Sequence, residues 1–138
     1  MIRSPVSLTN LSLTRLPKSE ILRGRRRFSA LLRLGTKKEG EALSLRGLYF
    51  WVALAEPRIQ VAFSVSKRVF RKAHDRNRVR RLMREAYRQE KPSFLSLLQG
   101  GSAWLLWSWK APVFPTLEAL RTDMRKLFQA WQSSWAKA

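Results

Sequence analysis

One segment, Asp75–Arg88 (DRNRVRRLMREAYR), restricts the fold more than any other part of the chain. It holds six arginines, yet apolar residues recur between them every three to four positions. At about 100° per residue, this spacing predicts an α-helix with two unlike faces. The fold must bury one face and leave the other open. The apolar face is formed by Val79, Leu82, Met83 and Ala86, and the cationic face by Arg76, Asn77, Arg80, Arg81, Arg84 and Arg88.

The cationic face carries an electrostatic penalty. Its arginines repeat every fourth residue from Arg76 to Arg88, and like charges at this spacing destabilise a helix by about 0.2–0.5 kcal/mol per pair. Arg76 and Arg78 also lie in the first turn, where the helix macrodipole disfavours cations. A guanidinium can donate two parallel hydrogen bonds to a phosphate and can stack on bases. These features favour an anionic partner over a face that is merely solvated.

The charge balance of the whole chain agrees with this interpretation. There are 28 Lys+Arg against 9 Asp+Glu, so the formal net charge is +19 and the pI is near 11.8. Such an excess repels itself unless a polyanion is bound. Nucleic acid is the leading candidate and an anionic membrane surface the second. A membrane-surface helix needs aromatic residues on its apolar side, whereas this segment carries small and aliphatic ones, so we expect no membrane partner.

Two absences in the sequence exclude further classes of protein. The chain has no cysteine, which removes disulfides, cysteine-ligated zinc and a thiol nucleophile. No apolar run approaches the roughly 20 residues of a membrane span. We expect a cytoplasmic protein.

Hydrophobic periodicity predicts the other elements. Apolar residues alternate from Ile59 to Val65, which indicates a strand with one buried face and a small, polar opposite face. A stripe at helical spacing from Leu117 to Trp131 predicts a core-packed helix with Thr116 as its cap. We expect helices over 25–34 (ending at Gly35), 75–90 and from Thr116, and strands over 42–45, 48–55, 59–66 and 102–110.

The limits of these elements give the domain organisation. Gly47 should mark a bend or bulge between the first two strands, Asp75 should cap the arginine helix, and Pro92 should end it. We expect residues 1–18 to form a flexible N-terminal extension and 19–135 a single domain. The order α-β-β-β-α-β-α, with a helix between the last two strands, predicts an α/β (α+β) two-layer sandwich.

The arginine segment resembles the arginine-rich motif of the bacterial ribonuclease P protein subunit, commonly R-N-x-x-K/R-R-x-x-R-E-x-x-R. Lys67 and Arg68 stand where this family ends a strand with a basic pair, and the resemblance spans about 20–131. The matching motif residues are Arg76, Asn77, Arg80, Arg81, Arg84, Glu85 and Arg88, and the upstream helix matches through Leu22, Phe28, Leu31 and Gly35.

The resemblance implies a fold of the ribosomal-protein-S5-domain-2-like type, with an unusual left-handed crossover through the arginine helix. It implies a protein subunit of a ribonucleoprotein endoribonuclease that removes the 5′ leader of precursor tRNA, with the catalytic centre in the RNA. The implied partners are the ribonuclease P catalytic RNA and precursor tRNA, with no protein partner required. The implied cofactor is RNA-bound Mg²⁺. A ribosomal or other structural RNA-binding protein and a DNA-binding module are the alternatives.

Carried onto this sequence, the resemblance implies two sets of site residues. Leu32 stands where the family often has a second Phe, and Trp109 where Arg is common. Trp109 is either a base-stacking platform or core, Trp107 is expected in the core, and the role of Trp104 stays open. The RNA-binding set is Lys67, Arg68, Arg76, Asn77, Arg78, Arg80, Arg81, Arg84 and Arg88; the candidate leader-binding cleft is Phe28, Leu32, Ser64, Ser66 and Trp109.

Acidic residues give no indication of a protein active site. Hydrolysis of a phosphodiester needs clustered carboxylates for metal ions or a general acid/base pair. The nine acidic residues are scattered, and the closest pair, Glu39 and Glu41, flanks a glycine. His74, the single histidine, is either a general base or, as we favour, a loop residue or RNA contact. We therefore assign no catalytic residue and no metal ligand to this chain.

Overall fold

The structure, a computed structural model, describes residues 16–50, 58–98 and 100–136. They form one four-stranded sheet in the order β1-β2-β4-β3, together with helices. No helix among these residues is long and apolar enough to cross a membrane. The elements are η1 (Lys18–Glu20), α2 (Arg25–Leu34), β1 (Thr36–Glu39), β2 (Leu43–Phe50), β3 (Ile59–Val65), α3 (Ala73–Leu97), β4 (Ser102–Trp109) and α4 (Leu117–Ala136).

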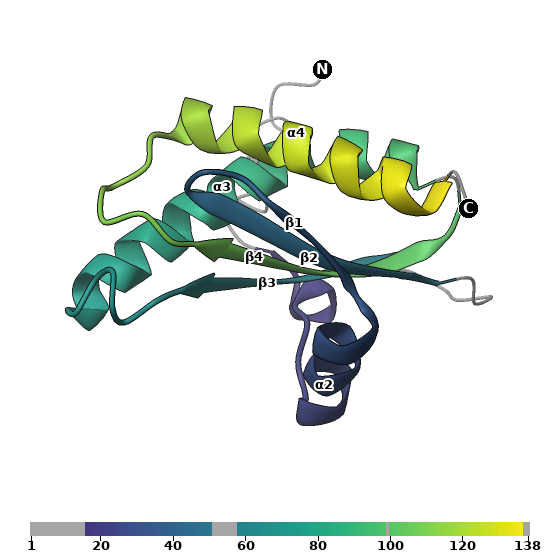
Figure 1. Ribbon diagram of the computed structural model, residues 1–138, viewed down its shortest axis with the longest axis horizontal. Coiled ribbons are helices and arrows are strands. Elements are labelled where there is room, and N and C mark those ends of the chain that lie inside the picture. Colours follow the sequence, from purple (N-terminus) through teal and green to yellow (C-terminus); the bar gives the residue numbers. More distant parts are fainter. Residues whose placement is uncertain (1–15, 51–57, 99, 137–138) are drawn as a thin grey trace, which may run out of the picture.

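Helices lie on both faces of the sheet (Figure 1). α3 and α4 pack on one face and on each other, while α2 contacts β2 from the opposite side. The core lies between the sheet and the α3–α4 pair. Burying a single Phe side chain contributes about 1.5–3 kcal/mol, so this core holds α3 firmly by its apolar side. Its largest fully buried side chains include Tyr87, Phe94, Trp107, Phe128 and Trp131.

The strand connections match the predicted order. β1 and β4 each pair antiparallel with β2, whereas β3 and β4 run parallel and are joined through α3. The α-β-β-β-α-β-α order and the α+β architecture are therefore confirmed, and the left hand of the β3-α3-β4 crossover stays a prediction. At the outer edge of β3, Leu22 donates a backbone hydrogen bond of 2.9 Å to Val61, which ties the N-terminal segment to the sheet.

The prediction of two separate strands, with a bend or bulge at Gly47 between them, is wrong. β2 runs without a break from Leu43 to Phe50, and Gly47 is a regular, buried position within it. A side chain there would lie 2.5 Å from the Trp131 indole, so the glycine admits the close approach of α4. The rest of the predicted second strand lies outside the described residues.

The sequence pattern predicted neither the strand β1 nor the correct start of the folded domain. β1 has the sequence TKKE and is largely exposed at the sheet edge, so it shows no apolar alternation. Leu16, assigned to the flexible extension, is 8% exposed and belongs to the hydrophobic core. The folded domain therefore includes residues before the predicted boundary at Ser19. The predicted extension over residues 1–15 lies outside the described part of the chain.

The predicted limits of the arginine helix are also wrong. α3 begins at Ala73 after Lys72, so Asp75 lies in the first turn and is not the cap. Pro92 lies inside the helix, although proline removes one backbone hydrogen bond there. The helix continues because its last turns bury Phe94, whose ring stacks on Phe128 with centroids 4.2 Å apart. Packing between distant segments outweighs the local proline signal.

The first and last helices were predicted correctly. α2 spans the predicted 25–34, and the following residue is Gly35. α4 begins directly after Thr116, whose hydroxyl accepts a hydrogen bond of 3.2 Å from the backbone N–H of Ala119. Its predicted core stripe is buried at Leu120, Met124, Leu127, Phe128 and Trp131.

Candidate nucleic-acid interface

α3 presents the two faces that the sequence predicts. Val79, Met83 and Ala86 are fully buried, and Leu82 packs against the core edge. The opposite side, which we call the arginine face, is partly or fully exposed along its length. It consists of Arg76, Asn77, Arg80, Arg81, Arg84 and Arg88.

Two guanidiniums on the arginine face are oriented by hydrogen bonds to neutral groups. Arg76 Nη1 donates to the backbone carbonyls of Phe70 and Arg71, at 2.8 Å each, and so fixes the loop before α3. Arg80 Nη2 donates to Asn77 Oδ1 at 2.6 Å. Neither interaction cancels a positive charge. Both side chains therefore keep their charge while losing part of their rotational freedom.

One carboxylate lies within this cationic surface. Glu85 forms a salt bridge with Arg88, and its other neighbour Gln89 donates a hydrogen bond of 2.7 Å to Glu85 Oε2. Burial opposes ionisation of Glu85, but the hydrogen bonds from Gln89 and Arg88 hold the pKa of this carboxyl below its usual value. Arg88 is thus the cation that Glu85 engages.

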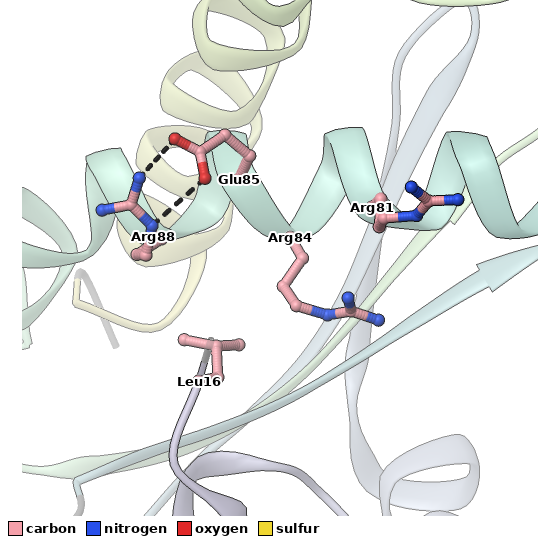
Figure 2. Close-up of a pocket in the computed structure, with 5 residues that line it drawn as sticks. All are labelled: Leu16, Arg81, Arg84, Glu85 and Arg88. Atoms are coloured by element: carbon pink, nitrogen blue, oxygen red, sulfur yellow. Dashed lines mark hydrogen bonds and ion pairs between the residues drawn. The ribbon is translucent and has the colours of Figure 1, made fainter. Parts of the chain in front are cut away.

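Arg81 and Arg84 are the most available cations of the arginine face. In the described part of the chain neither forms a salt bridge, and together with Leu16 and the Glu85–Arg88 pair they line a hollow of about 150 Å³ (Figure 2). Burial of Arg84, with the charges of Arg80 and Arg81 nearby, lowers the pKa of its guanidinium. A partly buried guanidinium beside other cations, with the one nearby carboxylate engaged by Arg88, favours an anion at this place.

The remaining predicted RNA-binding residues flank the start of α3. Lys67 and Arg68 are exposed in the loop between β3 and α3. The Arg68 backbone N–H donates to Ser66 Oγ at 3.1 Å, which shapes this loop. Arg78 points away from the arginine face, and its guanidinium carbon lies 4.5 Å from the centroid of the Phe114 ring. The basic surface thus extends from the loop around the first turns of α3.

Four of the five residues predicted for the leader cleft lie on the side of the sheet that carries α2 or at its edge. Phe28 is partly buried and Leu32 is 55% exposed, both on α2. Ser64 lies on the face of β3 opposite the core, and Ser66 follows the strand. The sheet surface at Ser64 and Ser66 therefore carries only small polar side chains, and a leader cleft here stays a prediction.

Trp109 does not belong to this group. It pairs in register with Val65, and both side chains are buried on the helix-covered face of the sheet. Its indole N–H donates to the Val113 carbonyl at 3.1 Å. Of the two roles left open for Trp109, core is correct, because alternation along β4 turns it away from α2. Trp107 is buried as predicted, and Trp104 lies on the α2 side.

Comparison with known proteins decides which family this arrangement represents. The family model for Ribonuclease P matches residues 16–137. The chain belongs to the ribonuclease P protein family. Ribonuclease P protein components from Chlorobium phaeobacteroides and Chlorobaculum tepidum are 34% and 33% identical to it. The matches cover 87% and 91% of this chain, and 90% and 88% of those proteins.

Solved structures carry the same fold. The ribonuclease P protein of Staphylococcus aureus matches with a TM-score of 0.63, covering 82% of this chain and 95% of that one at 14% identity. A Staphylococcus aureus ribonuclease P protein mutant with defective mRNA degradation activity matches with a TM-score of 0.62, covering 94% and 97% at 12% identity. Family and fold together make this chain a protein subunit of ribonuclease P in tRNA processing, with the ribonuclease P RNA as partner.

Several carboxylates of this ribonuclease P protein are engaged with cations. Glu20 pairs with Lys91, Glu39 with two lysines, and Glu90 with Arg121 and Arg125. Among the described residues, no group of three His, Cys, Asp or Glu side chains could hold a metal ion. His74 lies exposed in the first turn of α3.

Proposed function

We propose that the arginine face binds the catalytic RNA of ribonuclease P, and that this RNA, not the protein, cleaves the 5′ leader from precursor tRNA. The observation that carries the proposal is a charged helix face that is backed by a rigid core and on which, among the described residues, Arg81 and Arg84 form no salt bridge. A face fixed in this way loses little conformational freedom on binding, so more of the phosphate contact energy is retained.

The arginines of the arginine face have two proposed roles: some are held in a fixed orientation by the protein, and others are open to contact phosphates. Arg76 and Arg80 hold their guanidiniums in place through neutral partners, and Arg81 and Arg84 offer open donors. Arg88 is shared with Glu85, which sets the end of the cationic surface. Phosphate contacts would position the RNA without reading its sequence. The proposed contact set is Lys67, Arg68, Arg76, Asn77, Arg78, Arg80, Arg81, Arg84 and Arg88.

We further propose that the single-stranded leader of precursor tRNA lies beside α2. Phe28 supplies a ring for stacking, Leu32 an apolar contact, and Ser64 and Ser66 hydroxyls on a surface without bulk. Mg²⁺ would be held by RNA phosphates and supply the activated nucleophile. The protein would reduce repulsion between RNA strands and so lower the Mg²⁺ concentration that cleavage requires.

Reconstitution tests the proposal. The chain, mixed with its cognate ribonuclease P RNA, should permit cleavage of precursor tRNA at a Mg²⁺ concentration where the RNA alone is inactive. A chain that binds structured RNA tightly without stimulating cleavage would instead be a structural RNA-binding protein. That result would overturn the proposal.

Charge variants test the interface itself. Arg81→Ala and Arg84→Ala should each reduce the salt dependence of RNA binding, because each lost phosphate contact lowers the logarithmic slope by about 0.7–0.9. Lys126→Ala is the matched control, since it removes one exposed charge from α4. Equal slopes for all three variants would exclude the arginine face as the RNA surface.

A further inference from the structure

A second hollow on the α2 side of the sheet is not used by the proposed function. It has a volume of about 590 Å³ and lies between α2 and the end of the sheet where β2 ends and where β3 and β4 begin. A row of three paired residues forms its floor: Leu48 of β2 opposes Trp104 of β4, which opposes Gln60 of β3. We call this hollow the Trp104 groove, and its lining is Arg27, Ala30, Leu34, Leu48, Phe50, Gln60 and Trp104.

The Trp104 groove and the candidate leader cleft lie on opposite flanks of α2. Leu31 is fully buried, so it marks the side of α2 that meets the sheet. At about 100° per residue, Phe28 and Leu32 fall on one side of Leu31, and Ala30 and Leu34 on the other. Ala30 and Leu34 line the groove. α2, which lies below the sheet in Figure 1, therefore turns one flank toward the groove and the other toward the candidate leader cleft.

Contacts with the sheet support this division. Arg46 Nη1 donates to the Leu32 backbone carbonyl at 3.4 Å, so the last turns of α2 lie beside the row that contains Arg46. That row continues through Leu106 to Ala62. Side chains alternate in direction along a strand, so the next row on the same face is that of Trp104 on one side and that of Ser64 on the other. The groove and the candidate leader cleft thus use different rows of the sheet.

The floor of the Trp104 groove is aromatic and preorganised. The Phe50 ring packs edge-on against Trp104, with centroids 5.1 Å apart and planes at 66°. The Arg27 guanidinium lies 5.8 Å from the Trp104 ring centroid and donates to Gln60 Oε1 at 2.9 Å. Gln60 in turn donates to the Ser19 carbonyl at 2.9 Å. A partly exposed indole is therefore held beside a fixed cation.

None of the described residues that line the groove is acidic. Arg25, Arg26 and Arg27 form the exposed first turn of α2, which holds no acidic residue. Cations at a helix N-terminus oppose the macrodipole, typically by about 0.3–1 kcal/mol each. The N-cap residue Gly24 supplies no side-chain hydrogen bond to offset this. An anion at this turn would remove the penalty.

We propose that the Trp104 groove binds an unpaired nucleotide of RNA, with its base stacked on Trp104 and its phosphate at the α2 arginines. An indole beside clustered arginines matches the combination by which single-stranded nucleic acids are held. A second copy of this chain is a poorer occupant, because it would bring a further net charge of +19 against the same arginines. The inference rests on the proposed function, which makes RNA the partner.

Photochemical crosslinking and binding together test the groove. The full chain is irradiated with a twelve-nucleotide oligouridylate that contains 4-thiouridine, and its affinity for a labelled copy is measured by fluorescence anisotropy. We expect crosslinks on Trp104 or Phe50. Trp104→Leu should weaken binding about tenfold, as loss of one stacking platform does. Trp104→Phe, which keeps an aromatic ring, should weaken it less than threefold.

The control removes an exposed apolar side chain that does not line the groove. Val113 is 60% exposed after β4, and Val113→Ala should leave the Trp104 crosslink in place. The proposal is overturned if crosslinks map only to Phe28 or α3. It is also overturned if Trp104→Leu binds like the parent, or if Trp104→Leu and Trp104→Phe weaken binding equally while lowering the melting temperature equally.

The same variants keep this inference separable from the proposed function. If Arg84→Ala impairs binding of the catalytic RNA while Trp104→Leu leaves oligouridylate affinity unchanged, the groove inference alone fails. If the parent chain gives no precursor-tRNA cleavage with its RNA but Trp104→Leu still loses oligouridylate affinity, the groove inference stands and the proposed function fails.

Discussion

Individual arginines on α3 differ in what they do: some form bonds within the fold, and others are open to a partner. Arg76 bonds two backbone carbonyls and Arg88 bonds Glu85, so these two also stabilise the fold. Arg81 and Arg84 line the hollow beside Leu16 and form no salt bridge among the described residues. An alanine scan that ignores this difference would mix losses of stability with losses of RNA affinity. This is why Arg81 and Arg84 are the informative positions.

Glu39 provides a pH-dependent test at the same scale. Hydrogen bonds from Lys37 (2.7 Å) and Lys110 (2.9 Å) lower the pKa of Glu39 from 4.5 to about 2. Because the folded-state pKa is the lower one, these bonds stabilise the protein above about pH 4.5 and are lost as the pH falls toward 2. Glu39→Gln should therefore lower the urea midpoint at pH 7 slightly, and by less as the pH approaches 2.

The size of this effect is limited by exposure, since salt screens an exposed ion pair. Glu41→Gln is the matched control, because Glu41 is exposed nearby and in no salt bridge among the described residues. A direct NMR titration of the Glu39 carboxyl gives the deciding measurement. A midpoint near 4.5 would show that the two lysine contacts do not persist in solution.

The close approach of β2 and α4 at Gly47 fixes how α4 packs on the sheet. Gly47→Ala places a methyl group 2.5 Å from the Trp131 indole, so β2 and α4 must separate. We expect a loss of about 1–3 kcal/mol in the free energy of unfolding, as overpacking of a core usually causes. Denaturant unfolding measures it.

A double-mutant cycle isolates the clash. Combining Gly47→Ala with Trp131→Leu should cost less than the sum of the two single changes, because the smaller side chain removes the overlap. Strict additivity would mean that Gly47 acts through backbone conformation and not through contact with Trp131.

Elements whose signal is local could be predicted from sequence, and those that depend on distant partners could not. The limits of α2 and the arginine face of α3 each follow from the apolar period of a single helix, and both were predicted correctly. The end of α3 depends on Phe94 stacking against α4, and β1 depends on pairing with β2. Trp109 was open because a strand's register, not its composition, decides which face a side chain takes.

The Trp104 groove illustrates the same limit for a site. Its floor requires three strands in one register, and its wall requires α2 to pack beside a particular row. Apolar residues on both faces of β4 gave no sequence signal that places Trp104 on the α2 side. The nearest available signal was the run Arg25–Arg27 at the start of a helix, where cations are disfavoured.

At the scale of the whole molecule, a net charge of +19 links the stability of the folded chain to the binding of its RNA partner. The free chain is destabilised by self-repulsion, which a polyanion relieves. Binding of RNA to the folded state alone adds to stability by mass action. Salt should therefore act in opposite directions on the stability of the free protein and on its affinity for RNA.

Thermal unfolding without RNA tests this coupling. Between 0.1 M and 1 M NaCl the Debye length falls from about 10 Å to about 3 Å, so repulsion between neighbouring guanidiniums is screened and the melting temperature should rise by several degrees. RNA affinity should fall over the same range, because bound counterions compete. The Arg81→Ala/Arg84→Ala variant should gain less from salt than the parent, since two of the crowded charges are gone. A melting temperature that is flat or falls with salt would mean that internal pairs such as Glu90 with Arg121 and Arg125, at 2.6 and 2.7 Å, outweigh the excess charge.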